Sequence, residues 1–154
     1  EYLQFASSSF AEKTEKFNMA KLIVNTVEKY ENKNISTKLD KTIVLNGKKN
    51  LIQRCLNNLI DNSIKYSNNI NIQLTKSNNY LSITIDDDGP GISKKEYQNV
   101  FKPFYKIDKS RSDTKSSVGL GMSIASDVIR SHGGNIILDK SPQNGLRVKI
   151  ILPF

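Results

Sequence analysis

Apolar residues recur along the chain with two kinds of spacing, which together predict the order of helices and strands. Spacings of three and four residues, typical of an amphipathic helix, run through 20–31, 48–66 and 119–131. Shorter apolar segments bounded by turn residues predict strands at 35–39, 42–45, 70–75, 81–87, 135–140 and 146–152. Turns are expected at Asn46-Gly47, at 77–79 and at Asn144-Gly145. We therefore predict an α+β fold, a two-layer α/β sandwich in which helices cover one face of a mixed sheet.

The strand predicted at 81–87 ends in an unusual concentration of charge, in the sequence ITIDDDGPGI of residues 83–92. A period of two places Leu81 and both isoleucines of the strand on one face, and Asp87 on the same face. A carboxylate at the inward end of an apolar row is costly unless a donor hydrogen-bonds to it. A capped turn or a cluster of surface charge is the simpler interpretation of this stretch taken alone.

The helix predicted at 48–66 carries a broad apolar stripe, and four polar side chains line one edge of it. At about 100° per residue, Asn58, Asn62, Lys65 and Tyr66 fall together on that edge. A carboxamide oxygen can bind Mg²⁺ beside phosphate oxygens, a lysine can reach those phosphates, and a tyrosine can cover a flat ring. A polar rim explains any one of these residues, whereas four ligand-capable groups on one edge are harder to explain in that way.

Two short glycine motifs could bring backbone N–H groups close to a phosphate. Gly119 and Gly121 stand where the long polar loop 102–118 becomes a helix, and helix N-termini favour anions. Gly89 and Gly91 follow the acidic end of the predicted strand. A flexible hinge and a plain turn explain these glycines equally well when each motif is taken alone.

Length, charge and cysteine content narrow the function classes. The 154 residues suit one domain, and the single Cys55 rules out an internal disulfide framework. The formal net charge of +8 suggests a nucleic-acid partner, but Trp is absent and no basic cluster is interleaved with aromatic residues. A basic surface that handles phosphates or an acidic partner fits the charge better. No apolar run approaches the length of a transmembrane helix.

The motifs occur in a characteristic order: NNLIDNSIKYS, then DDDGPGI, then FKPFYK and finally GLGMSIA. In this order and spacing, residues 17–153 resemble the catalytic and ATP-binding domain of two-component sensor histidine kinases. That domain belongs to the superfamily of gyrase, Hsp90-type chaperones, histidine kinases and MutL. The resemblance implies the Bergerat-type ATP-binding fold, and the style of the motifs is similar to that of osmosensor-type kinases. Each motif alone is modest support, whereas four in order are specific.

The resemblance implies a role for each motif residue. Asp87 accepts a hydrogen bond from the adenine amino group, which gives the inward carboxylate a donor and selects adenine over guanine. Asn62 coordinates Mg²⁺, and Asn58 supports the phosphates or the metal. Lys65 contacts phosphate, and Tyr66 packs on the adenine.

The resemblance also implies a lid over the nucleotide, formed by the loop 102–118. Its cationic candidates for the γ-phosphate are Lys106, Arg111 and Lys115, while Phe101 and Phe104 are expected to hinge and anchor it. The implied catalytic set is Asn62, Lys65, Lys106 and Arg111. The remaining residues expected at the nucleotide are Gly89, Gly91, Ile92, Phe104, Val118, Gly119, Leu120 and Gly121.

By the same resemblance, the chain uses Mg²⁺ and ATP to phosphorylate a histidine on a separate dimerisation domain of the same full-length protein, for relay to a response regulator. Residues 1–12 are expected to be the end of the preceding dimerisation helix and a linker, and 13–154 the ATP-binding catalytic domain. The full-length protein is expected to be a homodimer anchored in the inner cell membrane, with this domain cytoplasmic. His132, the only histidine, follows the last motif, so we expect it to interact with a helix C-terminus rather than accept phosphate.

Three other functions stay open at this point. A serine kinase of the anti-sigma-factor type has a similar fold and size, although the FKPFYK motif and the long loop favour the histidine kinase. A non-catalytic module would bind ATP without transferring phosphate. A nucleic-acid-binding protein, which we do not expect, would show steeply salt-dependent DNA binding that ignores nucleotide.

Overall fold

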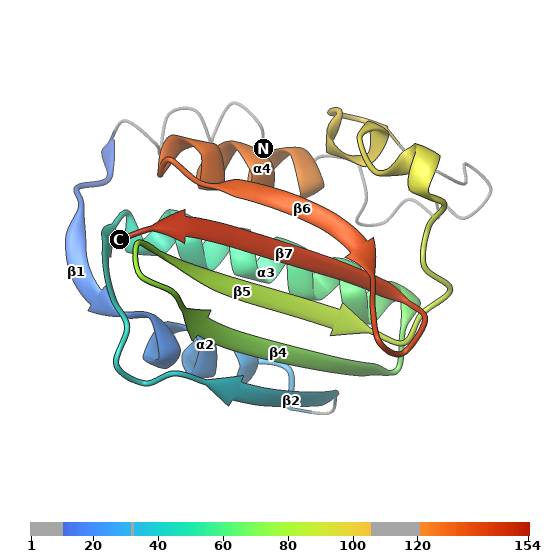
Figure 1. Cartoon of the computed structure of the whole chain (residues 1–154), viewed down its shortest axis with the longest axis horizontal. Coiled ribbons are helices and arrows are strands. Elements are labelled where there is room, and N and C mark those ends of the chain that lie inside the picture. Colours follow the sequence, from blue (N-terminus) through green and yellow to red (C-terminus); the bar gives the residue numbers. More distant parts are fainter. Residues whose placement is uncertain (1–10, 32, 106–120) are drawn as a thin grey trace.

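The computed structural model describes residues 11–31, 33–105 and 121–154. Its main sheet has five strands in the order β2-β4-β5-β7-β6 (Figure 1). β2 runs parallel to β4 and the other neighbours are antiparallel, so the sheet is mixed. The strands are β2 (Asn34–Leu39), β4 (Asn69–Lys76), β5 (Tyr80–Asp87), β6 (Asn135–Lys140) and β7 (Leu146–Pro153).

Helices cover one face of this sheet, and α3 crosses behind the central strands in Figure 1. The helices are α2 (Met19–Val27), α3 (Lys49–Tyr66) and α4 (Gly121–Ser131), and two 3₁₀ turns, η1 (Lys94–Glu96) and η2 (Asn99–Phe101), follow β5. The predicted two-layer α+β architecture is confirmed. None of the helices in the described ranges is long and apolar enough to cross a membrane.

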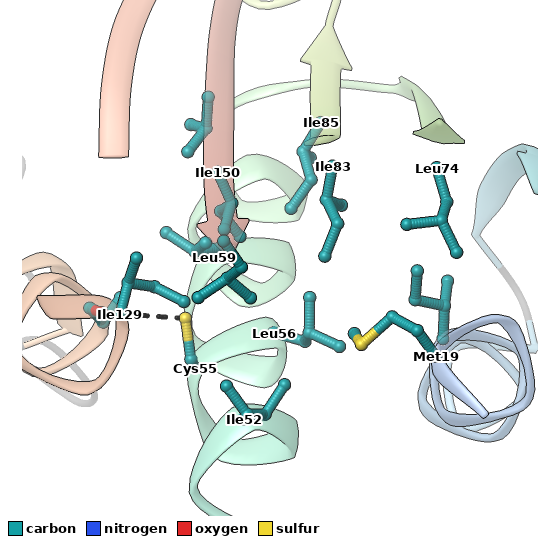
Figure 2. Close-up of a cluster of buried hydrophobic side chains, with 14 of the residues drawn as sticks. Met19, Ile52, Cys55, Leu56, Leu59, Leu74, Ile83, Ile85, Ile129 and Ile150 are labelled. Atoms are coloured by element: carbon teal, nitrogen blue, oxygen red, sulfur yellow. Dashed lines mark hydrogen bonds between the residues drawn. The ribbon is translucent and has the colours of Figure 1, made fainter. Parts of the chain in front are cut away.

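The apolar core lies between α3 and the inner face of the sheet. Figure 2 shows Ile52, Leu56 and Leu59 of α3 on the side that faces Ile83 and Ile150. Ile83 of β5 and Ile150 of β7 are direct register partners, so both strands present their alternate apolar residues to the same helix. The apolar faces predicted for the helix and for the strands therefore pack against each other in one core.

A second, two-stranded sheet joins β1 (Glu15–Asn18) to β3 (Val44–Gly47) in antiparallel register. The turn expected at Asn46-Gly47 is wrong, because both residues continue β3 and pair with β1. β1 was not predicted, since Phe17 is the single buried residue among its four and leaves no period of two to detect.

α2 ends earlier than the helix predicted at 20–31. Asn18 begins it, with its side-chain oxygen accepting an N–H of the first turn at 3.0 Å. After Val27 the chain turns, and the hydroxyl of Tyr30 donates to Oδ1 of Asp61 on α3 at 2.7 Å. Tyr30 therefore belongs to a turn that is fixed on α3, not to the apolar stripe of α2.

Two side chains from distant parts of the chain cap the N-terminus of α3. The carboxylate of Glu12 accepts the N–H groups of Asn50 at 2.7 Å and Leu51 at 3.1 Å. Nε2 of His132 accepts the N–H of Lys48, the N-cap residue, at 3.0 Å. The first N–H groups of a helix have no partner within it, so these bonds satisfy donors that would otherwise be unpaired.

The sheet face opposite the helices is polar, yet one of its carboxylates is buried. Asp86 is 3% exposed and pairs with Arg147, its register partner on β7. Nε of Arg147 lies 2.7 Å from Oδ1 of Asp86, and Nη2 lies 2.9 Å from Oδ2. Both carboxylate oxygens are satisfied by this two-point contact, which accounts for a buried charge on an outer face.

Candidate functional site

Three segments converge at the end of β5: the C-terminus of α3, the loop that follows β5, and the turn between β6 and β7. A Cβ at Gly89 would lie only 2.6 Å from the carbonyl oxygen of Tyr66, so the loop packs directly on the end of α3. A Cβ at Gly145 would overlap the carbonyl oxygen and Oδ1 of Asp87, so the β6–β7 turn packs directly on the end of β5. The close contacts place Asp87 where all three segments meet.

Asp87 lies on the inner face of β5, as its position in the alternating pattern predicts, and is 4% exposed. Its Oδ1 accepts two backbone N–H groups, from Gly89 and from Leu146, each at 3.0 Å. No group in the described ranges donates to Oδ2. One carboxylate oxygen is therefore fixed by two backbone donors, whereas the other has acceptor capacity that the described residues do not use.

The loop after β5 needs glycine at one position for its conformation. Gly91 has φ +69°, in the left-handed region that side chains disfavour. A Cβ at Gly91 would also lie 3.3 Å from the carbonyl oxygen of Gly145, so this loop and the β6–β7 turn pack against each other. Ile92, the next residue, is half-buried against the core.

The four polar residues predicted on one edge of α3 all lie within one uninterrupted helix. Asn58 and Asn62 are half-buried, whereas Lys65 and Tyr66 are exposed. Nζ of Lys65 lies 5.5 Å from the centroid of the Tyr66 ring, a cation–π distance. The edge thus changes from half-buried amides to an exposed cation and ring as it approaches the loop after β5.

Asn58 has a buried side-chain nitrogen, Nδ2, with no hydrogen-bond partner among the described residues. A buried amide donor without a partner costs free energy, so such a group calls for an acceptor. The Cβ of Asn58 would lie 4.0 Å from a Cβ at Gly121, which puts the start of α4 beside this amide. A phosphate oxygen would supply the acceptor that the described residues do not.

Several predicted site residues lie outside the described residues: Lys106, Arg111, Lys115, Val118, Gly119 and Leu120. The two phenylalanines of FKPFYK differ, since Phe101 packs on the core whereas Phe104 is 69% exposed with φ +66°. The hydroxyl of Tyr105 donates to the carboxylate of Glu96. Phe101 thus fixes the end of η2 on the core, and the Tyr105–Glu96 hydrogen bond joins the start of the predicted lid to η1.

His132 lies at the far end of α3 from Asp87. Its Nδ1 donates to the carbonyl of Val128 at 2.8 Å, while Nε2 accepts from Lys48. The expected interaction with a helix C-terminus is present as this hydrogen bond to Val128, and the second bond to Lys48 was not predicted.

The sequence analysis missed Ser141. Its hydroxyl donates to the carbonyl oxygen of Asp87 at 2.6 Å and accepts the N–H of Gly145 at 2.9 Å. The Asn144-Gly145 dipeptide signalled the hairpin turn correctly. It carried no signal that this turn touches Asp87, which is more than fifty residues earlier in the chain.

Comparison with known proteins identifies relatives of this arrangement. Residues 47–154 match the family described as "Histidine kinase-, DNA gyrase B-, and HSP90-like ATPase". The sensor histidine kinase CpxA of Escherichia coli K12 is 36% identical over 111 residues, which are 71% of this chain and 24% of CpxA. The sensor histidine kinase WalK of Bacillus subtilis is 34% identical over 108 residues, 67% of this chain and 18% of WalK. The chain thus spans no more than about a quarter of these relatives.

Solved structures share the fold. The mycobacterial sensor histidine kinase MprB has a TM-score of 0.80 at 23% identity, over 92% of this chain and 97% of that chain. The catalytic domain of histidine kinase ThkA, in a nucleotide-free form, has a TM-score of 0.80 at 22% identity, over 92% and 95% of the two chains. At such identities the likeness shows the fold, and the sequence relatives carry the family.

Proposed function

Since the chain belongs to the family of histidine kinase-, DNA gyrase B- and HSP90-like ATPases, we propose that it transfers the γ-phosphate of ATP to a histidine on a separate domain of a longer sensor kinase. The chain is an ATP-binding catalytic domain of the sensor histidine kinase type. These relatives favour the histidine kinase over the anti-sigma-type serine kinase and over the non-catalytic module. The osmosensor subtype expected from the motifs is not confirmed by them.

The observation that carries the proposal is that only one of the two carboxylate oxygens of Asp87 has hydrogen-bond donors among the described residues. Oδ1 is held by two backbone N–H groups, so the carboxylate cannot turn freely, and Oδ2, without a donor from the described residues, is left as an oriented acceptor on a side chain that is only 4% exposed. An acceptor of this kind suits the amino group of adenine and rejects the carbonyl that guanine carries at the same position. The contact would give ATP its base selectivity.

The amide edge of α3 supports phosphate and metal binding. The unpartnered Nδ2 of Asn58 suits a phosphate oxygen, and the Lys65 ammonium adds positive charge on the same edge. No cluster of three or more His, Cys, Asp or Glu that could hold a metal occurs in the part of the chain that the structure describes. The amide oxygen of Asn62, half-buried on the same edge of α3, would hold Mg²⁺ together with phosphate oxygens, because amide oxygens are ligands that Mg²⁺ accepts. When bound, Mg²⁺ offsets the negative charge of the phosphates during transfer.

The acceptor histidine would come from outside this chain. His132 uses both ring nitrogens in hydrogen bonds at the opposite end of α3, so neither is available to attack a phosphate. We propose that residues 1–12 link the domain to a histidine-bearing dimerisation domain of a homodimeric protein. The whole protein would be anchored in the inner membrane with this domain in the cytoplasm, and a response regulator would receive the phosphate.

The test is transfer in trans. The chain is incubated with radiolabelled Mg-ATP, alone and with a separate helical domain that carries an acceptor histidine. We expect acid-labile, alkali-stable label on the added domain and none on this chain. Transfer should be weaker than in a tethered kinase, because linkage raises the effective concentration of the acceptor to roughly millimolar.

Two variants sharpen the test. His132→Gln should leave transfer in trans nearly unchanged, whereas Asn62→Ala should abolish it. Acid-labile label on this chain alone, lost in His132→Gln, would overturn the assignment of the acceptor. Acid-stable label on an added serine-bearing partner would favour the serine kinase, and ATP binding without any transfer would favour the non-catalytic module.

A further inference from the structure

We propose that Ser141 is a positioning residue for adenine recognition, which acts by holding Asp87 in the orientation that leaves Oδ2 facing the base. The inference rests on the proposed function, because it assigns Ser141 a role through the carboxylate that would bind adenine. Ser141 begins the turn between β6 and β7, and its side chain hydrogen-bonds the backbone of Asp87.

The hydroxyl of Ser141 joins two elements. It donates to the carbonyl oxygen of Asp87 at 2.6 Å and accepts the N–H of Gly145 at 2.9 Å, and Ser141 is 4% exposed. Two backbone bonds close the same turn: the Ser141 N–H donates to the Gly145 carbonyl, and the Asn144 N–H donates to the Ser141 carbonyl, both at 3.0 Å. The hydroxyl is the one group of this closed turn that ties it to the main chain of β5.

The same turn also holds the carboxylate of Asp87. The last register pair between β5 and β7 joins Asp86 to Arg147, so the Asp87 contacts lie just beyond the end of the strand ladder. There the Leu146 N–H donates to Oδ1 of Asp87 at 3.0 Å. A displacement of the turn would therefore move a donor that fixes the carboxylate torsion.

Gly145 makes this coupling tight. A Cβ at Gly145 would overlap both the carbonyl oxygen and Oδ1 of Asp87, so the turn lies in direct contact with the main chain and the side chain of that residue. Loss of the Ser141 hydroxyl would leave the Asp87 carbonyl and the Gly145 N–H without their shared partner in a buried place. Both groups would then move to find new partners, and Oδ1 of Asp87 would move with them.

A purely structural role for Ser141 predicts a different result. If the hydroxyl only stabilises the hairpin, its loss lowers stability and affects all nucleotides equally. If it positions Asp87, its loss selectively weakens nucleotides that donate to Oδ2. The two roles are separated by comparing ATP with purine riboside triphosphate, which lacks the 6-amino group and is otherwise the same ligand.

The experiment measures the affinities of both nucleotides by calorimetry, with Mg²⁺, for wild type and Ser141→Ala. We expect the preference for ATP over purine riboside triphosphate to fall about fivefold in Ser141→Ala, which corresponds to loss of one well-made hydrogen bond. The affinity for purine riboside triphosphate should stay within about twofold of wild type, because its base makes no contact with Oδ2.

The matched control is Thr26→Val. Thr26 is buried in α2, and its hydroxyl donates to the carbonyl of Leu22 at 2.7 Å and accepts from Nε2 of Gln53 at 3.5 Å. The substitution therefore removes a buried hydroxyl that donates once and accepts once, as that of Ser141 does, but away from Asp87. We expect a loss of thermal stability similar to that of Ser141→Ala and no change in the nucleotide preference. An equal loss of preference in Thr26→Val would assign the effect to general destabilisation.

Asp87→Asn separates failure of this inference from failure of the proposed function. If Asp87→Asn keeps the full preference for ATP, the adenine assignment itself is wrong. If Asp87→Asn removes the preference while Ser141→Ala keeps it, only the positioning role is overturned. Should Ser141→Ala not fold, Ser141→Cys replaces it: the thiol is a weak donor of similar size, so an intermediate preference is expected and an unchanged one refutes the role.

Discussion

The cap that Glu12 forms on α3 leads to a prediction that the geometry makes quantitative. Its carboxylate accepts the N–H groups of Asn50 and Leu51, the second and third residues of the helix, at 2.7 and 3.1 Å. Lys48, the N-cap residue, makes no capping bond with its own side chain. Glu12 therefore accepts the helix N–H groups that a Ser, Thr, Asp or Asn at the N-cap position usually accepts. The cap is thus supplied from the segment just before β1.

The cost of removing this cap can be estimated from two contributions. Loss of an N-cap acceptor typically costs about 1 kcal/mol, and loss of a negative charge at a helix N-terminus costs about 0.5 kcal/mol. Glu12→Ala removes both, so we expect it to destabilise the domain by about 1.5 kcal/mol. For a domain of this size that corresponds to a fall of about 5 °C in Tm. Glu12→Gln keeps one of the two acceptor oxygens and loses the other together with the charge, so an intermediate cost of about 1 kcal/mol is expected.

The assay combines thermal unfolding with amide hydrogen exchange. Amide exchange should be faster at Asn50 and Leu51 in Glu12→Ala than in wild type. The stability that Glu12→Gln loses relative to wild type should be smaller at high salt, because salt screens the charge–dipole attraction. Glu15→Ala is the control, since Glu15 is exposed on β1 and surface substitutions change stability by less than about 0.5 kcal/mol. If Glu12→Ala and Glu15→Ala match in Tm and in exchange at both amides, the cap contributes nothing and the reasoning fails.

The remaining predictions concern metal, thiol reactivity and acid stability. Asn62→Ala should weaken binding of Mg-ATP far more than binding of ATP in EDTA; equal weakening in calorimetry would remove Asn62 from the metal. Burial raises the pKa of the Cys55 thiol, so the folded protein should react only slowly with iodoacetamide at pH 8. The reaction rate should equal the rate at which unfolding exposes Cys55, and bound ATP should lower it. Backbone N–H donors from Asn69 and its neighbour hold the pKa of Asp88 in the folded protein below its usual range. Asp88 therefore stabilises the fold above about pH 3.9, and this stabilisation is lost as the pH falls through the lowered pKa. Urea midpoints should therefore fall more between pH 7 and 2 in wild type than in Asp88→Asn, and parallel curves would contradict this.

Local patterns predicted the helix and strands that build the site because each carries its signal within one element. The edge of Asn58, Asn62, Lys65 and Tyr66 needs only the 3.6-residue period, and α3 is one uninterrupted helix. The inward position of Asp87 needs only the alternation of β5. Both features are independent of what the rest of the chain does.

The features that could not be predicted depend on pairing between distant segments. The contact of Ser141 with Asp87 follows from the register of β5, β7 and β6, which no local pattern encodes. The β1–β3 sheet has the same origin, since β1 is too short to show a period and its pairing with β3 joins distant segments. The Glu12 cap likewise joins residues 38 positions apart, where a local capping signature would have been visible.

The three consecutive aspartates at the end of β5 are given three different environments. Both oxygens of Asp86 bind Arg147 on the outer face of the sheet. Both oxygens of Asp88 also have partners, because Oδ1 accepts two backbone N–H groups and Oδ2 accepts the side-chain amide of Asn69. Asp87, on the inner face between them, has two donors on Oδ1 and none from the described residues on Oδ2. A carboxylate in a largely buried side chain is costly when its oxygens lack donors, and of the three aspartates only Asp87 has an oxygen without a donor from the described residues, which is why we propose it as the adenine contact.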